Sequence, residues 1–491
     1  MKSSSLFRGD CLLDTDALKR TALYSLLLLF AAHAFCFFNL TYSSGSVMLH
    51  AASGRSAQIE AGHYLLPLYW RIRGSISAPL WVGMLSALYL TAVNLVLVVL
   101  LSMQRPLSIF ALCGATTVNA AVLSICAASL HTADAVFLAL LLGALACLCC
   151  LRMRWGALPG TLLLTAALAL DANAFAFFAA LTLIVLLADL LDNRRARLLD
   201  AVLPFAALIA SLLLHQLGHM FFLRRNGMQS ETGFLLFSGD LLGAYCAPIR
   251  AVFSPLTAYA QLSAALRALL MLLCAASIVR LARRHAGKAL LLSAGLLLLP
   301  LLCGATFLSG QENLQIVPAY CLLDVCVVML LSRLTPESRV MRRLTAAAFS
   351  ILFLGNIVFS NQVYLKKNLE LEATLSMMSR VVTRMEKVPG YQVGYTPVAI
   401  VGTPEDSIFS GERTGFEHLS ALDAAKGNFA IASEMDMIWY MWEVLGYPVN
   451  FVSTYDLSRI AETDAVLSMP VFPQEGCCAF VDDVLVVKLS Q

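Results

Sequence analysis

Long apolar runs separated by short polar segments dominate the sequence between residues 21 and 361. A helix of about 20 apolar residues is long enough to cross the hydrocarbon core of a bilayer. By that criterion the pattern predicts about eleven membrane-spanning helices. They cover residues 21–40, 78–102, 107–130, 133–151, 156–170, 172–191, 201–222, 257–279, 289–308, 315–332 and 344–361. We therefore expect a mainly α, polytopic helical bundle in a membrane.

After Asn361 the pattern becomes that of a soluble domain. Apolar residues recur there at alternating spacings of four and three, which predicts an amphipathic helix over 363–388. The Pro389-Gly390 pair is expected to stop this helix. The apolar stripe consists of Leu371, Leu375, Met378, Val382 and Met385.

The remainder of the tail reads as alternating strands and helices. Residues 397–401 predict a buried strand, 436–445 a helix, and 480–487 a strand, a tight turn and a second strand. The chain should therefore consist of a transmembrane domain, 1–362, and a small C-terminal α/β domain, 363–491. We interpret the C-terminal domain as a lid or a partner-binding module.

Composition agrees with a membrane protein and argues against nucleic-acid binding. Hydrophobic residues make up 59% of the 491 residues and charged residues 13%, with a mean hydropathy of +0.78. The net charge of only +3 includes no concentrated basic face of the kind that binds phosphate backbones. Most of the 14 cysteines fall inside apolar runs, where they pack as small hydrophobes. Cys477 and Cys478 are adjacent, and neighbours in sequence rarely form an unstrained disulfide.

The basic residues predict an orientation for the bundle. Lys19 and Arg20 precede the first span, which reads as a retained anchor because no small-residue cleavage site follows it. Further basic residues occupy alternate loops: Arg105, Arg152 and Arg154, Arg194 to Arg197, Arg283 to Lys288, and Arg339 to Arg343. The positive-inside rule makes these loops and the N-terminus cytoplasmic. Loops 41–77 and 223–256 and the tail after Asn361 should then be extracytoplasmic, on a protein of the plasma membrane.

A polar stretch over residues 56–79 lies between the first two apolar runs, in the first outer loop, 41–77. If its first half is helical, Glu60 shares a face with His63 and Tyr64, at the i,i+3 and i,i+4 spacings. A carboxylate, an imidazole and a phenol would then meet at a membrane surface. This is a plausible place for catalysis.

The same stretch has a second interpretation without catalysis. An amphipathic segment over 56–76 that lies in the membrane interface would also place Tyr69 and Trp70 at the depth of the lipid headgroups. Arg71 and Arg73 would then reach to lipid phosphates. The residue types alone do not decide between these two interpretations.

Charged residues at or within the spans are the other candidates for function, because a carboxylate in a membrane costs a few kcal/mol. Asp134 opens the fourth span at its outer edge, and Asp171 and Asn173 begin the sixth span at the same level. Asp134 could equally cap its helix and interact with the helix dipole. Asp171, which ends one short span and starts the next, has a similar structural interpretation.

Two further pairs lie deeper in their spans. His215 and His219 are four residues apart and share a helix face, where interhelical hydrogen bonding is a better explanation than a metal pair. Arg267 and Asp324 are the deepest charges, and they could pair with each other or line a lipid groove.

Several of these stretches together resemble the GtrII-like glucosyltransferase-domain family of polytopic membrane proteins, and the likeness extends over nearly the whole chain. In the first outer loop and the fourth span it is carried by Gln58-Ile59, Gly62-His63-Tyr64-Leu65, Pro67, Ile72-Arg73-Gly74, Ala78-Pro79 and Thr132-Ala133-Asp134-Ala135. In the tail it is carried by residues 361–369, 415–419, 445–448 and 469–473. This chain has Gly45-Ser46 where members often carry Asp-Ser, and His63 where they carry an arginine.

The resemblance implies a GT-C type glycosyltransferase with an outward-facing active site. Such an enzyme would move glucose or a related hexose from a polyprenyl-phosphate donor to a cell-surface polysaccharide. The donor arrives lipid-linked, so no nucleotide-binding loop or cofactor is expected, whereas dependence on a divalent cation stays open. The expected partners are the lipid-linked sugar, a glycan acceptor and the bilayer.

The chemistry of this transfer assigns roles to the candidate residues. A carboxylate must accept the proton of the acceptor hydroxyl, and the candidates are Glu60 and Asp134. Cations must neutralise the leaving lipid phosphate. The predicted substrate-binding residues are Arg55, His63, Tyr64, Arg71, Arg73, Asn173, Arg224 and Arg225.

Two other functions fit the same sequence. A transporter or flippase of lipid-linked sugar would use deep charges such as Arg267 and Asp324, and an internal repeat of spans. A non-catalytic relative that takes part in a glycan pathway would fit the two departures from the family pattern.

Overall fold

The computed structural model describes residues 14–39, 55–193, 198–228, 240–254, 256–306, 317–334, 339–407, 409, 414–431 and 433–490. Gly45-Ser46, the rest of the loop up to residue 54, and the Arg194 to Arg197 run lie outside the described residues. The chain divides into two compact units. We call residues 1–38, 51–126 and 132–361 the membrane unit, and residues 39–50, 127–131 and 362–491 the C-terminal unit.

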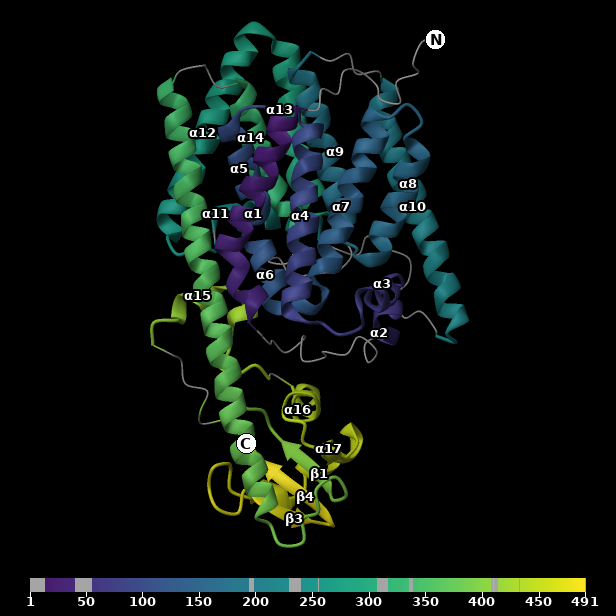
Figure 1. Cartoon of the computed structure of the whole chain (residues 1–491), viewed down its shortest axis with the longest axis vertical. Helices are drawn as coiled ribbons and strands as arrows, with labels where there is room; N and C mark the ends of the chain where they lie inside the picture. The colour runs from purple at the N-terminus through teal and green to yellow at the C-terminus, as the bar shows by residue number, and fades with distance from the viewer. Residues whose placement is uncertain are drawn as a thin grey trace. The chain divides into compact units, whose positions relative to one another are not determined.

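The membrane unit is a bundle of helices (Figure 1). In the described part of the chain, nine helical segments are long and apolar enough to cross a membrane. They are α1 (Thr15–Phe38), α4 (Pro79–Leu100), α5 with α6 (Pro106–Thr117 and Ala120–Ala128), α7 (Leu130–Arg152), α9 (Ala174–Leu191), α10 (Leu198–Arg225), α12 (Ala260–Arg284), α13 (Ala286–Cys303) and α15 (Arg339–Glu386). These helices indicate a multi-pass membrane protein, as the sequence predicted.

The remaining predicted spans fall on shorter helices. Segments 156–170 and 315–332 correspond to α8 (Ala157–Leu170) and α14 (Cys321–Leu334), which have 14 residues each. Helix α14 follows a 3₁₀ turn over Pro318–Tyr320. The predicted loop 223–256 is partly wrong, because it contains the apolar helix α11 (Leu241–Phe253), whose first turn is capped by the Asp240 side chain.

Paired charges join several helices at one end of the membrane unit, where α4, α7, α9 and α14 finish. We call this the basic end. Arg152 on α7 donates two hydrogen bonds to Asp189 on α9, at 2.8 and 2.9 Å. Arg333 on α14 does the same to Asp192, at 2.9 and 3.1 Å. These bidentate pairs fix the ends of α7 and α14 against α9.

The deepest charges of the bundle also form a pair. Arg267 on α12 lies 3.3 Å from Asp324 on α14, with both side chains largely buried. Of the two alternatives that the sequence leaves open, pairing or lining a lipid groove, the structure shows the pairing. A neutralised pair avoids the cost of a single charge among apolar helices.

Close approach between α11 and α13 depends on Gly304, the residue that follows α13. A Cβ atom at this position would overlap the backbone carbonyl oxygen of Ala244 on α11. We expect Gly304→Ala to destabilise the membrane unit by about 1–3 kcal/mol, because the two backbones must separate. Gly287→Ala, near the start of α13 and facing open space, is the control and should be neutral or slightly stabilising. Thermal unfolding of the purified full chain measures both.

The C-terminal unit contains a four-stranded sheet in the order β2-β1-β4-β3. Its strands are β1 (Pro397–Val401), β2 (Asn450–Phe451), β3 (Cys478–Val481) and β4 (Val484–Lys488). Strand β1 is parallel to β2 and β4, and β3 forms an antiparallel hairpin with β4. Its short helical elements are α16 (Glu434–Trp439), a π turn (Tyr440–Val444), α17 (Thr454–Ala461), α18 (Asp464–Leu467) and two 3₁₀ turns (Glu417–Ala421 and Asp423–Ala425).

The two faces of this sheet pack against different helices. Val398, Ile400 and Val487 point to a core that includes Met378 and Met385 of α15. Alternate residues such as Ala399 and Val486 pack with α17 and α18 on the other face. Side chains alternate across a strand, so each strand contributes to both cores.

The predicted secondary structure of this unit is largely confirmed. The strand 397–401 and the strand, turn and strand over 480–487 are present, and Asp482 and Asp483 form the turn with positive φ angles of 43° and 65°. The amphipathic helix 363–388 is present as well, but it is continuous with the last predicted span in the 48-residue helix α15. One stripe position is wrong: Leu375 is exposed, and Met377 is buried in its place.

The stability of the C-terminal unit should depend on pH through the side chain of Glu405. Its carboxylate accepts hydrogen bonds from the backbone N–H groups of Asn428 and Phe429, at 2.7 and 2.6 Å. Burial nevertheless raises the pKa of Glu405 above its ordinary value of 4.5. The folded state thus holds this proton more tightly than the unfolded state, so the stability gained from protonation is complete below pH 4.5 and is lost as the pH rises through the folded-state pKa.

We therefore expect Glu405→Gln to become progressively more stable relative to the wild-type protein as the pH rises. Thermal unfolding of the full chain, measured from pH 4 to pH 8, tests this difference. Glu462→Gln, at an exposed position of the same unit, should leave the slope unchanged. A Glu405→Gln curve parallel to the wild-type curve would contradict the assignment.

The described cysteines are free thiols, and all of them are buried or half-buried. The Cys477 and Cys478 sulfur atoms lie 3.9 Å apart, so this pair forms no disulfide, as predicted. Burial raises the pKa of the Cys478 thiol to about 12, which keeps it protonated and unreactive at neutral pH.

Candidate active site

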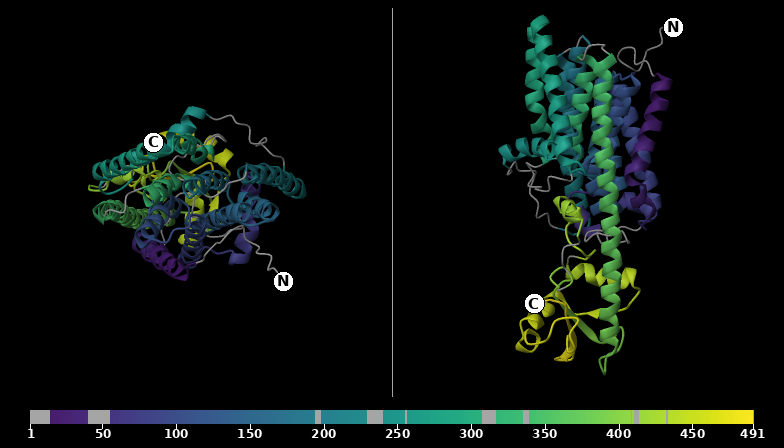
Figure 2. Two further views of the ribbon diagram at one scale, coloured as in Figure 1. Left: turned by 90° about the horizontal axis from the view of Figure 1, so that it is seen from above. Right: turned by 90° about the vertical axis from the view of Figure 1, so that its left-hand side faces the viewer.

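The polar stretch of the first predicted outer loop folds into two short helices, α2 (Arg55–Glu60) and α3 (Leu66–Arg73). Both lie at the end of the membrane unit opposite the basic end, where α4, α7 and α9 begin (Figures 1 and 2). We call this the α3 end. Gly62 has a φ of 91°, which a helix cannot contain, and this residue separates α2 from α3. The expectation that Glu60, His63 and Tyr64 share one helix face is therefore wrong, because α2 ends at Glu60.

Helix α3 has clear start and stop signals in the sequence. Pro67 occupies its first turn, where a missing N–H costs nothing. Gly74 ends it with a φ of 116° and donates to the Trp70 carbonyl oxygen, closing the last turn. The side chains of Leu66 and Trp70 pack against Ala135 of α7, so one face of α3 is buried on the bundle.

A buried ion pair fixes the C-terminal end of α3. Arg73 donates from Nη1 to Asp134 Oδ1 on α7 at 2.6 Å, and the two side chains are 1% and 0% exposed. Arg73 also donates from Nη2 to Ser77 Oγ at 2.8 Å. The alternative interpretation of Asp134 as a simple helix cap is therefore insufficient, because its carboxylate neutralises a guanidinium from the loop.

Tyr69 completes this arrangement. Its hydroxyl donates to Asp134 Oδ2 at 2.8 Å, so both carboxylate oxygens have partners. Burial and the nearby Asp134 charge raise the pKa of Tyr69, which keeps the phenol protonated and able to donate. We call Arg73 and Asp134 the buried pair, and Tyr69 is its third hydrogen-bonded member.

The other end of α3 is fixed against α10. The Tyr64 ring stacks between His215 and Phe222, with centroid distances of 5.4 and 4.9 Å. Gly218 leaves room for this ring, since a Cβ atom there would lie 2.6 Å from the Tyr64 hydroxyl oxygen. His219 donates from Nε2 to the Ile59 carbonyl oxygen at 2.8 Å, so the hydrogen bonding predicted for this histidine is present.

Beside Tyr64 lies a cluster of polar side chains from three segments: the α2–α3 loop, the α8–α9 turn and α10. We call it the histidine cluster: His63, Asp171, Asn173 and His215. The Asp171 carboxylate accepts from the Asn173 backbone N–H at 2.7 Å and interacts electrostatically with the His63 ring. His63 in turn interacts with His215 on α10. Burial raises the pKa of Asp171, and the neighbouring His63 opposes this effect.

Three polar atoms of the histidine cluster are buried without a hydrogen-bond partner in the described part of the chain: His63 Nδ1, Asn173 Oδ1 and His215 Nδ1. A buried polar group without a partner costs about 1–3 kcal/mol. Such groups gather where a ligand or water completes the hydrogen bonding. This cluster is therefore the best candidate for a binding or catalytic site at the α3 end.

The structure distributes the predicted site residues over three environments. His63, Tyr64 and Asn173 belong to or border the histidine cluster, whereas Arg73 and Asp134 form the buried pair. The remaining predicted residues are all exposed: Arg55, Glu60, Arg71, Arg224 and Arg225. Glu60 and Asp134 thus occupy different surroundings, one exposed and one buried.

The sequence draws attention to Asp171 and His215, but it favours structural roles for both, and neither is among the predicted site residues. Asp171 lies in the tight turn between α8 and α9. The predicted topology puts it at the same edge of the membrane as Asp134, and this was the feature of the sequence that could have assigned it to the site. The contact between His215 and the loop could not be predicted, since it depends on how Tyr64 packs on α10. The described residues contain no group of three or more His, Cys, Asp or Glu side chains arranged to hold a metal ion.

Comparisons with known proteins returned no family model, no curated protein and no solved structure that matches this chain.

Proposed function

We propose that this chain is a membrane glycosyltransferase that moves glucose or a related hexose from a polyprenyl-phosphate donor to a glycan acceptor. The observation that supports this best is the histidine cluster. It combines a carboxylate, two imidazoles and an amide with unsatisfied buried atoms at one end of a membrane-spanning bundle. Proton transfer from an acceptor hydroxyl requires groups of these types.

In the proposed reaction, the acceptor hydroxyl loses its proton to His63, and its oxygen forms a bond to the anomeric carbon of the sugar. The bond from that carbon to the phosphate oxygen breaks, and the polyprenyl phosphate leaves with the electron pair. Asp171 stabilises the imidazolium that forms, through its electrostatic interaction with His63. Asn173 and His215 are placed to hold sugar hydroxyls through their unpartnered atoms.

Exposed arginines at the α3 end fit the phosphate of the donor. Arg71 extends from α3, and Arg224 and Arg225 end α10. Arg55 begins α2. A phosphate that keeps its charge as it leaves is stabilised by guanidinium groups, which bind it in a bidentate manner. The exposure of these side chains matches a donor whose prenyl chain stays in the bilayer.

Asp134 has a different role in this proposal. Its two oxygens already accept from Arg73 and Tyr69, so accepting a further proton from a hydroxyl would require the pair to open. We therefore assign Asp134 to positioning α3 over the bundle, and Glu60 remains the alternative carboxylate from the sequence.

The direct test is a transfer assay with the purified full chain in nanodiscs. The reaction contains labelled polyprenyl-phosphate-glucose and a cell-envelope acceptor fraction, and the expected result is label in the glycan with release of polyprenyl phosphate. The runner-up is a flippase of lipid-linked sugar. Movement of the labelled lipid between leaflets of proteoliposomes, without transfer to the acceptor, would favour the flippase and reject the enzyme.

A further inference from the structure

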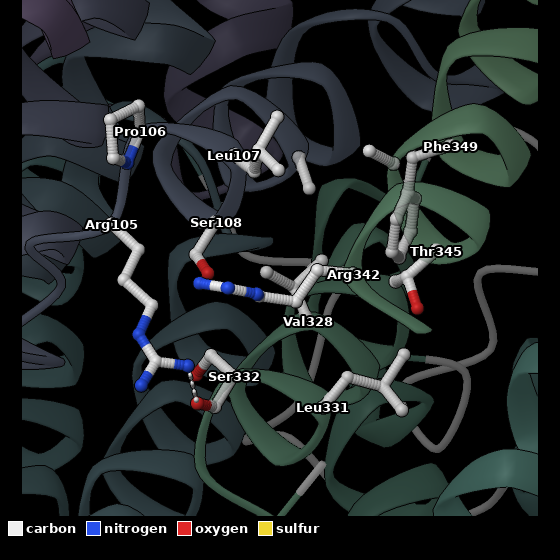
Figure 3. A pocket seen from close by; sticks show the side chains of 12 residues that line it. Arg105, Pro106, Leu107, Ser108, Val328, Leu331, Ser332, Arg342, Thr345 and Phe349 are labelled. Atoms are coloured by element: carbon white, nitrogen blue, oxygen red, sulfur yellow. Dashed lines mark hydrogen bonds between the residues drawn. The ribbon is translucent and has the colours of Figure 1, made fainter. Parts of the chain in front are cut away.

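A pocket of about 160 Å³ lies at the basic end of the membrane unit, between the start of α5, the end of α14 and the start of α15. Figure 3 shows the side chains of Arg105, Ser108 and Arg342 around it. The proposed transfer reaction uses none of these residues, because they lie at the opposite end of the bundle from the histidine cluster.

Basic side chains line this pocket. None of the described residues that line the pocket is an aspartate or a glutamate, whereas two of them, Arg105 and Arg342, are arginines. The described part of the wall therefore supplies two guanidinium groups, which favour an anion.

Further donors reinforce this preference. Arg105 is held at the rim by a long hydrogen bond of 3.5 Å to the Ser332 carbonyl oxygen, and the Ser108 hydroxyl faces the same space. Helix α5 begins at Pro106, so its first turn, with the positive end of the helix dipole, also lines the pocket. Two guanidinium groups, a hydroxyl and a helix start make a site for a phosphate group.

The opposite wall of the pocket is apolar. Val328 and Leu331 of α14 and Phe349 of α15 supply it, and all three side chains are buried in the bundle. A free phosphate ion gains nothing from such a wall. An amphiphile places its phosphate on the arginines and the first carbons of its chains on the apolar side, so it uses both halves of the pocket.

We propose that this pocket binds the phosphate of an anionic phospholipid. The combination of a cationic rim and an apolar wall at the end of transmembrane helices is the arrangement in which basic pockets hold anionic lipid headgroups. The site is independent of the transfer reaction. It would anchor the basic end of the membrane unit to a leaflet that contains anionic lipid.

Native mass spectrometry of the delipidated full chain tests the proposal. The probes are phosphatidylglycerol, phosphatidylcholine and inorganic phosphate, each titrated separately. We expect the wild-type protein to bind phosphatidylglycerol at least tenfold more tightly than phosphatidylcholine. The double variant Arg105→Gln, Arg342→Gln should weaken phosphatidylglycerol binding by about 30-fold. Each cation near the membrane surface contributes a little over fivefold, about 1 kcal/mol, to the affinity for an anionic lipid. Arg283→Gln with Arg284→Gln, two exposed arginines that end α12 outside the pocket, should leave the affinity within twofold.

A second variant separates the pocket from general charge effects. Ala346→Phe fills the pocket without removing an arginine and should abolish the preference for phosphatidylglycerol, with unchanged thermal unfolding. Unchanged lipid selectivity in the double arginine variant would overturn the proposal. So would binding of inorganic phosphate as tight as that of phosphatidylglycerol, because the site would then accept a free anion and not a lipid.

Discussion

Replacement of Asp134 by alanine is expected to destabilise the membrane unit by about 3–5 kcal/mol, because it leaves the Arg73 guanidinium buried without its counter-charge. Both side chains are almost completely buried, and neither can recover hydration without moving α3 away from α7. Thermal unfolding of the purified full chain, followed by tryptophan fluorescence, measures the loss. Trp70 and Trp81 lie close enough to the buried pair to report on it.

Two control variants make this prediction specific. Lys426→Ala breaks an exposed pair with Asp423 in the C-terminal unit, and it should cost less than about 1 kcal/mol. Arg73→Met combined with Asp134→Leu removes both charges and should recover most of the stability lost in Asp134→Ala. If the double variant is as unstable as the single one, the loss comes from packing, and the ion pair is not its cause.

The second large effect is expected in the transfer reaction. His63→Gln should lower kcat by about 10²–10⁴-fold, the range for loss of a general base, and Asp171→Asn should lower it nearly as much. Protonation of Asp171 should abolish activity. Because burial raises the pKa of this carboxyl group, the loss should begin at a higher pH than the ordinary aspartate pKa of 3.8 would give. A pH profile of the rate therefore gives a second reading of the same site, with activity falling as the pH falls.

Matched variants decide between this site and the carboxylates predicted from the sequence. His285→Gln, at an exposed position of the basic end, should leave transfer unchanged. Glu60→Gln should have little effect, since Glu60 is the last residue of α2 and its side chain is exposed. If Glu60→Gln abolishes transfer and His63→Gln does not, Glu60 is the base and the histidine cluster has another role.

The sequence was sufficient to predict the helical bundle, because a membrane requires long apolar runs and few other patterns produce them. Each of the eleven predicted segments overlaps a helix. The same simple criterion explains the error in the predicted loop 223–256. Helix α11 has only 13 residues, so it is shorter than even the shortest of the predicted spans, 156–170.

The site was predicted less completely, since its geometry depends on tertiary contacts. The residue types in the first outer loop identified the right segment, and Arg73 and Asp134 were both among the candidates. Their pairing was not predicted, because they are 61 residues apart in the sequence. The face-sharing of Glu60 with His63 was wrong for a local reason, since the φ of Gly62 ends the helix between them.

The burial of the described cysteines has a practical consequence for measuring orientation in the membrane. Maleimide reagents that do not cross bilayers need an accessible thiol, and the thirteen described native thiols are all shielded to some degree. A cysteine introduced at Arg71, on α3, or at Arg283, at the end of α12, would be exposed and would stand out against these thirteen shielded thiols. In intact cells, labelling at position 71 but not at position 283 would show that α3 faces outward.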